Sequence, residues 1–245
     1  MRKPRELSGA LVRPKSLTEM VLDELRSRIV SGAFQLGMAL SENVLAAELG
    51  ISKTPVREAL LRLKLEGLVD IQPQRGTFVF QLDARQVTQI GELRETLEVQ
   101  ALQLALQRNR MALVHALGEC FREMRAAHAA GDTEAYRRTD ARFHDCIIEH
   151  SGNEFFRIAY GLIGFRVQAL RGRLTRETLL NDASFREHEA ILEGIRADDF
   201  TGTRRLLVRH IENTRQTYLQ VLAGAPPQPP QPLRRRGKSS PRAGR

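Results

Sequence analysis

The sequence lacks long apolar stretches, and this absence argues against two classes of protein. It contains no uncharged apolar run of about 18 residues, the length that indicates a membrane-spanning helix. Its first residues, MRKPRELSGALVRP, have no apolar core of the kind that a signal peptide requires. We therefore expect a cytoplasmic protein without membrane partners.

Cysteine is also scarce, because Cys120 and Cys146 are the only two in the chain. Two cysteines do not build the disulfide framework of a small secreted domain, so we expect a reducing compartment. Both are predicted to be small buried side chains rather than reactive groups. The hydrophobic fraction of 42% and the charged fraction of 27% are typical of a globular protein.

Acidic residues are nearly missing from both ends of the chain. Residues 224–245 contain six basic residues and no acid, and residues 1–15 contain five basic residues and one acid. The formal net charge of +9 therefore lies in these tails, which are predicted to be disordered because they have few large apolar side chains. Basic tails attract nucleic acid without sequence preference, so the charge alone does not indicate a specific DNA site.

Residues 16–82 show the pattern of a winged helix-turn-helix domain. Apolar residues at helical spacing predict helices over about 17–31, 41–49 and 52–66. Gly50 separates the second and third helices by the short turn of a helix-turn-helix. Alternating residues over 68–72 and 77–80, joined by a turn at 73–76, predict a β-hairpin.

From residue 83 to 223 only helical patterns follow one another. Breaks at Gly131, Gly152, Asn181-Asp182 and Asp198-Asp199 divide this region into helices of 14 to 23 residues or so. We expect an antiparallel bundle of about six helices. The fold class is therefore mainly α, with a winged helix-turn-helix domain followed by a helical domain.

The third helix and the hairpin tip carry the candidate DNA-binding residues. In a helix-turn-helix protein, the second helix of the motif enters the major groove with its first residues against the bases. An arginine there can donate two hydrogen bonds to guanine. The candidates are Ser52, Lys53, Thr54 and Arg57 on the helix, and Gln74, Arg75 and Gly76 at the tip. The alternative is an ordinary pair of helices with a solvated basic face.

The run LSENVLAAELGISKTPVREALLRLKLEGLVDIQPQRGTFV strongly resembles the GntR family of bacterial winged-helix regulators. The resemblance implies that Lys53, Thr54 and Arg57 contact operator DNA and that Gly76 lies near its backbone. Lys53 stands where arginine is commoner, so a point charge replaces a bidentate donor at that position. We expect a homodimer whose two winged helices bind a two-fold, double-stranded operator.

Four residues of the helical region have the side chains of a metal site. Asp140 and His144 are four apart and share one face of a helix, while His188 and His210 each lie on the apolar stripe of another helix. Burying these groups together is unfavourable unless they pair or bind a cation. Imidazole and carboxylate suit zinc, nickel, manganese or iron without selecting among them. The alternative is a set of core histidines, each hydrogen-bonded to a neighbour.

These four positions also resemble the effector domain of the FadR-like branch of the GntR family, which implies a divalent metal held by one Asp and three His. The resemblance further implies a small carboxylate beside the metal and places Arg94 toward it, although a solvated arginine on a helix face is the alternative. Glu189 stands where many relatives have arginine, which leaves the identity of the effector open. His115, His128 and His150 match no ligand position.

We therefore expect a sequence-specific transcription regulator, acting as a repressor, whose operator affinity is controlled by the carboxylate. Two alternatives belong to other classes. A hydrolytic metalloenzyme would use Asp140, His144, His188 and His210 to activate water, but the sequence offers no obvious general base, and we expect no enzyme. A nonspecific nucleic-acid binder would act through the basic tails.

Overall fold

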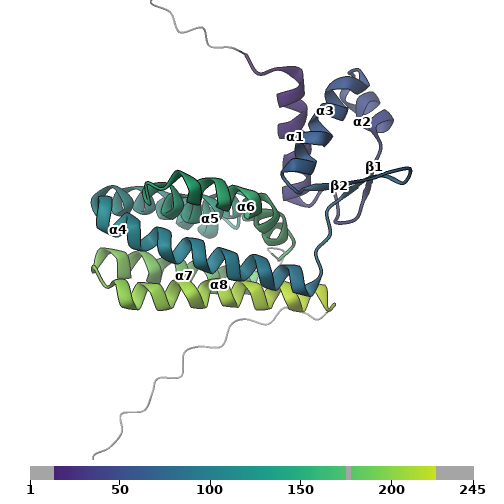
Figure 1. The fold of residues 1–245 in the computed structure, drawn as a ribbon. Coiled ribbons are helices and arrows are strands. Elements are labelled where there is room, and N and C mark those ends of the chain that lie inside the picture. The colour runs from purple at the N-terminus through teal and green to yellow at the C-terminus, as the bar shows by residue number, and fades with distance from the viewer. Residues whose placement is uncertain (1–13, 175–177, 225–245) are drawn as a thin grey trace, which may run out of the picture. The chain divides into compact units, whose positions relative to one another are not determined.

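The computed structural model describes residues 14–174 and 178–224 and divides into two compact units (Figure 1). Of the described residues, the first unit holds those up to Leu82 together with Ile158–Arg173, and the second holds Asp83–Arg157 and those from Leu174 onward. The tails predicted to be disordered lie almost entirely outside the described residues. Within the described ranges, no helix is both long and apolar enough to cross a membrane.

The first unit contains a winged helix-turn-helix, as predicted. Its helices are α1 (Leu17–Ser31), α2 (Glu42–Leu49) and α3 (Lys53–Leu65), and its strands are β1 (Ala39–Leu40), β2 (Val69–Gln72) and β3 (Gly76–Val79). The strands form an antiparallel sheet in the order β1-β3-β2, so the predicted hairpin is joined by a third strand. The sequence did not predict β1, because two residues are too few to show an alternating pattern.

Local signals in the sequence set the ends of these helices. Ser16 and Glu19 form a capping box at the start of α1, and Ser41 accepts a hydrogen bond from Val44 at the start of α2. Gly32 and Gly50 end the same two helices in the left-handed conformation that glycine adopts without a steric penalty. The helix-turn-helix geometry therefore follows from residues that the sequence displays.

The second unit contains the helical bundle, with α6 shared between the two units. Its helices are α4 (Ala84–Ala129), α5 (Thr133–His150), α6 (Glu154–Leu174), α7 (Thr178–Arg196) and α8 (Phe200–Leu222). The structure thus has five helices in its described bundle region, where about six were predicted. The difference lies in α4, which covers the first two predicted helices and is kinked at Asn109 (φ −156°, ψ 60°).

The kink has a local cause in the side chain of Asn109. Its Oδ1 accepts a hydrogen bond from the backbone N–H of Ala112, the bond that an N-capping residue makes at the start of a helix. The break predicted at Asn181-Asp182 was wrong, because α7 begins at Thr178 and continues through this pair. Asn and Asp favour helix starts but are tolerated within the first turns, where Asp182 here contacts His128.

Packing in the second unit brings α5, α7 and α8 against α4. Their facing sides bury large apolar side chains, among them Leu113, Leu117, Phe143, Ile147, Ile191 and Leu207. Asp140 and His144 lie on α5, His188 on α7 and His210 on α8, all inside this apolar layer. The bundle therefore places polar side chains from three helices in a buried, apolar region.

Candidate functional site

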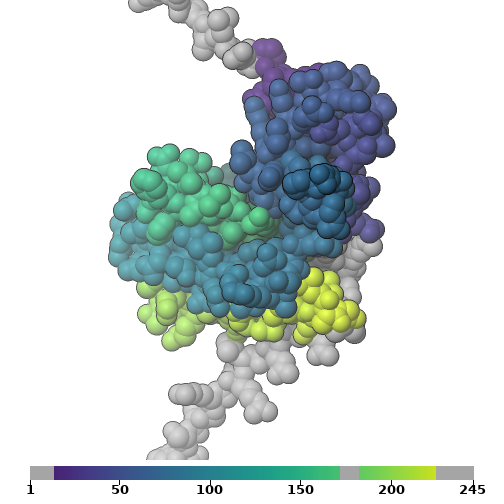
Figure 2. Space-filling view, turned by 45° about the vertical axis from the view of Figure 1, so that its right-hand side comes forward, coloured from purple at the N-terminus to yellow at the C-terminus, as the bar shows by residue number. Residues whose placement is uncertain are grey.

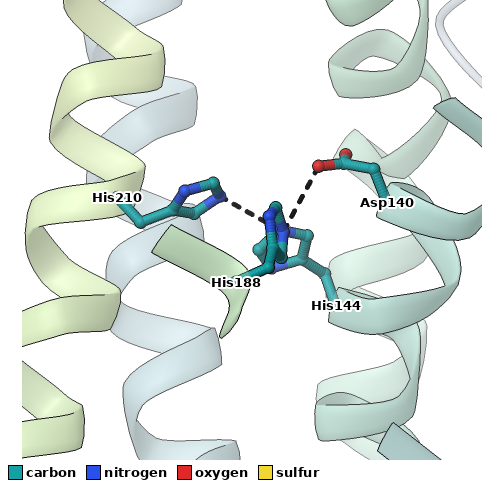
Figure 3. Close-up of side chains that lie close together, drawn as sticks. All are labelled: Asp140, His144, His188 and His210. Atoms are coloured by element: carbon teal, nitrogen blue, oxygen red, sulfur yellow. Dashed lines mark hydrogen bonds and ion pairs between the residues drawn. The ribbon is translucent and has the colours of Figure 1, made fainter. Parts of the chain in front are cut away.

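The side chains of Asp140, His144, His188 and His210 converge in the interior of the bundle (Figure 3). One ligand atom from each lies within 4.8 Å of the others, and all four residues are buried. The Nε2 atom of His144 is 3.2 Å from Nε2 of His188 and 3.3 Å from Nε2 of His210. Asp140 Oδ1 lies 3.3 Å from Nε2 of His188. The structure thus brings together the four residues predicted to hold a metal.

Each histidine has an oxygen acceptor next to its other ring nitrogen. Nδ1 of His144 lies 2.7 Å from Oε2 of Glu98, and Nδ1 of His210 lies 2.8 Å from Oε2 of Glu187. Nδ1 of His188 lies 2.7 Å from the backbone oxygen of Ser184. An oxygen at this distance requires the proton on Nδ1, so in the neutral ring Nε2 carries a lone pair. With all three rings neutral, three lone pairs and one carboxylate oxygen face one another.

The contact with Arg94 also indicates that Nε2 of His144 carries a lone pair. Nη2 of Arg94 lies 3.0 Å from Nε2 of His144, and because a guanidinium only donates, this Nε2 is the acceptor. The Nε of Arg94 donates to Oε1 of Glu98 at 2.6 Å. Arg94 is 3% exposed and Glu98 is fully buried, so this arginine is not on a solvated helix face. Arg94, Glu98 and His144 form one hydrogen-bonded chain beside the cluster.

Glu187 holds His210 from the other side of the cluster. Its Oε1 accepts a hydrogen bond from Asn213 at 2.5 Å while its Oε2 accepts from His210. Burial opposes the charged form of Glu187, but the hydrogen bonds from His210 and Asn213 hold the pKa of this carboxyl below its ordinary value. Glu187 is therefore a carboxylate that orients a histidine.

The four groups fit a divalent transition metal. Bonds of about 2.1 Å place neighbouring ligand atoms about 3.0 to 3.4 Å apart, depending on coordination geometry, and the closest contacts of the cluster lie in this range. Histidine ligands of metals characteristically donate their second N–H to a carboxylate or a carbonyl oxygen, as all three do here. A ring of imidazole lone pairs without a cation would hold groups that repel one another.

The remaining histidines and the cysteines have other contacts. His128 Nε2 contacts Asp182 and its ring stacks on Phe185, while His150 bonds the backbone oxygen of Cys146 and His115 is exposed. Cys120 is buried, its thiol donates to the backbone oxygen of Thr139, and burial raises its pKa to about 12. These residues are not among the four of the cluster, and Cys146 is half-buried, whereas the sequence predicted that both cysteines are buried.

The candidate DNA-binding residues of α3 lie on an exposed surface. Ser52 is the N-cap of α3, and Lys53, Thr54 and Arg57 occupy its first turns. All four are exposed, whereas Val56, Ala59, Leu60 and Leu63 on the opposite side of the helix are buried in the core of the first unit. Packing therefore orients α3 so that its first polar residues face solvent.

The hairpin tip presents the other predicted DNA contacts. Gln74, Arg75 and Gly76 are exposed, and the N–H of Arg75 bonds the backbone oxygen of Gln72 to close the turn. Gln74 and Gly76 have positive φ angles of 61° and 113°, and the open space at Gly76 leaves its backbone uncovered. The tip is shaped like a wing that can approach a nucleic-acid backbone closely.

Sequence reasoning missed three carboxylates that the structure places beside these sites. Glu98 and Glu187 bond cluster histidines, and Glu42 on α2 bonds Arg57 on α3. Glu98 follows Arg94 by four residues and Glu187 precedes His188, so each had a nearby signal in the sequence. Their bonds to His144 and His210, however, join residues on different helices.

Comparisons with known proteins agree with both units. The profile of the bacterial regulatory proteins of the gntR family matches residues 17–79, and that of the FCD domain matches residues 89–213. An HTH-type transcriptional regulator in an unstable DNA locus of Streptomyces ambofaciens is 30% identical over 83% of this chain and 85% of its own. The gluconate operon transcriptional repressor of Bacillus subtilis is 28% identical over 72% and 74%.

Among solved structures, McbR/YncC of E. coli superposes with a TM-score of 0.74 at 25% identity, over 85% of this chain and 99% of that one. The fold and the exposed start of α3 thus define a winged-helix transcription regulator with a helical C-terminal domain. The chain belongs to the GntR family, and its C-terminal domain is an FCD domain. The matched relatives are transcription regulators, which contradicts the metalloenzyme alternative.

Proposed function

We propose that this regulator is a metal-dependent repressor that releases its operator when a small carboxylate binds in the bundle. The observation that carries the proposal is the convergence of three Nε2 lone pairs and the Asp140 carboxylate beside a buried guanidinium. Asp140, His144, His188 and His210 would hold a divalent ion such as zinc, nickel, manganese or iron. The ion would supply a positive centre with coordination positions left for a ligand.

Arg94 supports a carboxylate as the class of effector. Its guanidinium donates an N–H to Nε2 of His144, so it lies at the edge of the space that the ligand atoms enclose. When this Nε2 bound the ion instead, the N–H would be released for a ligand. A carboxylate that bound a metal with one oxygen would place its other oxygen within reach of such a donor. Glu98 holds the guanidinium through Nε and keeps Nη2 directed inward. The gluconate operon repressor among the relatives makes sugar acids the first ligands to examine.

Operator binding would use the exposed start of α3 and the wing. Lys53, Thr54 and Arg57 would meet base edges and phosphates, with Ser52 at the helix N-terminus near the backbone. Gln74, Arg75 and Gly76 would lie along the backbone or the minor groove. Two such surfaces on a two-fold dimer would read two half-sites of a double-stranded operator.

An exposed apolar stripe on α6 supports a homodimer. Phe155, Ile158 and Leu162 are 79%, 49% and 59% exposed, and they follow one another at spacings of three and four. This is the spacing of a helix face that packs against another helix, and Gly161 beside it has open space above its backbone. Figure 2 shows part of α6, in green, at the surface of the molecule. We infer that the same stripe of a second copy covers it.

A thermal-shift experiment on the full chain tests the proposal. The protein is stripped with a chelator, reloaded with each of the four metals, and heated with gluconate, other small carboxylates and their uncharged analogues. We expect a carboxylate to raise the melting temperature only of metal-loaded protein, since a ligand at 100 times its Kd adds about 2.7 kcal/mol. The same carboxylate should weaken binding to an operator selected from random DNA.

Two results would contradict the proposal. One is a stripped protein that binds none of the four metals. The other is a carboxylate that shifts the melting temperature equally in a His188→Ala, His210→Ala variant and in the parent protein. A His115→Ala variant serves as the control, because His115 is exposed and lies outside the cluster.

A further inference from the structure

Arg57, an exposed arginine in the first turns of α3, is held by the carboxylate of Glu42 on α2. Arg57 donates through Nε to both carboxylate oxygens of Glu42, at 3.2 and 3.1 Å, and through Nη2 to Oε2 at 2.9 Å. Glu42 is the first residue of α2, and Arg57 lies in the first turns of α3. The two helices of the helix-turn-helix are thus joined by a two-pronged ion pair on their exposed side.

This ion pair uses only one edge of the guanidinium. The group has five N–H bonds, and Glu42 accepts those of Nε and one of Nη2. The other edge, formed by Nη1 and the second N–H of Nη2, is the pair of parallel donors that matches O6 and N7 of guanine in the major groove. The contact with Glu42 therefore orients Arg57 without using the edge that reads a base.

The pair is placed to influence recognition more than stability. The Arg57 side chain is 64% exposed, and exposed ion pairs contribute little to the stability of a fold. An unheld arginine is long and flexible, and it can reach a phosphate of any sequence as well as a base. A carboxylate beside it restricts that freedom and repels nearby phosphates.

We propose that Glu42 is a specificity-determining residue, which holds Arg57 for a guanine of the operator and disfavours its binding to phosphate. The inference rests on the proposed role of Arg57 in reading the operator. It predicts that loss of the Glu42 charge affects specific and nonspecific DNA binding differently. Loss of the Glu42 charge lowers discrimination at one base pair, while binding to unrelated DNA stays the same or becomes tighter.

The test begins with binding-site selection from random double-stranded DNA for the parent protein and for Arg57→Ala. The base pair whose preference disappears in Arg57→Ala is the one that Arg57 reads. The Kd is then measured for the operator, for the operator changed at that base pair, and for unrelated DNA. The proteins are the parent, Glu42→Gln, Arg57→Ala and the double variant.

We expect the parent to discriminate at this base pair by about five- to 150-fold, the range of a bidentate contact. Glu42→Gln should lose most of this discrimination. In protein that already carries Arg57→Ala, adding Glu42→Gln should not change the discrimination further. The matched control is Glu48→Gln, which removes the same charge from α2 but contacts Arg28 instead. Its discrimination should equal that of the parent, and melting curves establish that each variant is folded.

The outcomes separate the inference from the proposed function. If Arg57→Ala keeps the preference of the parent at every base pair, the proposed role of Arg57 is wrong and the inference is overturned with it. If Arg57→Ala loses a preference that the folded Glu42→Gln variant retains in full, the role of Arg57 stands and the inference alone is overturned. A uniform loss of affinity for all DNA in Glu42→Gln likewise overturns it.

Discussion

Replacing Glu187 by glutamine removes the charge that orients His210 while keeping the shape of the side chain. In the native protein, Oε2 of Glu187 accepts from His210 Nδ1 at 2.8 Å and Oε1 accepts from Asn213 at 2.5 Å. A glutamine has one acceptor oxygen, so its NH2 group must face one of these two donors. Loss of such an outer carboxylate lowers metal affinity by about 10- to 100-fold, equivalent to about 1.4 to 2.7 kcal/mol.

The assay is a metal titration in competition with a chromogenic chelator, using the stripped full chain. Glu212→Gln is the matched control, because Glu212 is on the same helix as His210 but pairs with Arg215 and is partly exposed. We expect the Kd for the metal to rise by at least tenfold in Glu187→Gln and by less than twofold in the control. Equal affinities in the two variants, both folded, would refute the role assigned to the Glu187–His210 pair.

Three further predictions concern other parts of the molecule. Arg94→Lys should bind the metal as the parent does but bind the carboxylate at least about tenfold more weakly by calorimetry, because lysine lacks the planar fork; equal affinity would count against Arg94 as the effector contact. Leu162→Glu should convert a dimer into a monomer in light scattering, whereas Leu65→Glu, at another exposed apolar position, should not. Cys120 should resist a thiol reagent at pH 8 until the protein is unfolded, because a pKa of about 12 leaves about one thiolate in 10,000; rapid labelling of the native protein would show that its surroundings are not those described.

The parts of the fold that the sequence predicted well depend on local signals. The helices over 17–31 and 52–66 agree with α1 and α3 because capping residues, glycines and apolar spacing lie within each segment. Local signals also gave a wrong prediction, a helix break at Asn181-Asp182, because residues that favour a helix start lie within α7 there. The strand β1 gave no signal, since its two residues depend on pairing with β3, more than 35 positions away.

The candidate metal cluster was predictable as a set of residues but not as a hydrogen-bonded assembly. Spacing placed Asp140 and His144 on one helix face and His188 and His210 on apolar stripes, and the family resemblance joined the four into one metal site. The partners that orient the rings were missed, because Glu98 and His144 are brought together only when α4 packs against α5. The same holds for Glu42, which reaches Arg57 across the turn between α2 and α3.

The groups that are hydrogen-bonded around the three histidines also determine the net charge of the bundle interior. Asp140, Glu98 and Glu187 contribute three carboxylates and Arg94 contributes one guanidinium, while histidines that bind a metal do so as neutral rings and add no charge. The sum is two negative charges in a largely buried region, equal and opposite to the charge of a divalent ion. A divalent ion bound there would balance this charge and become a structural component of the core, so its removal would loosen the helices that carry Asp140 and the three histidines.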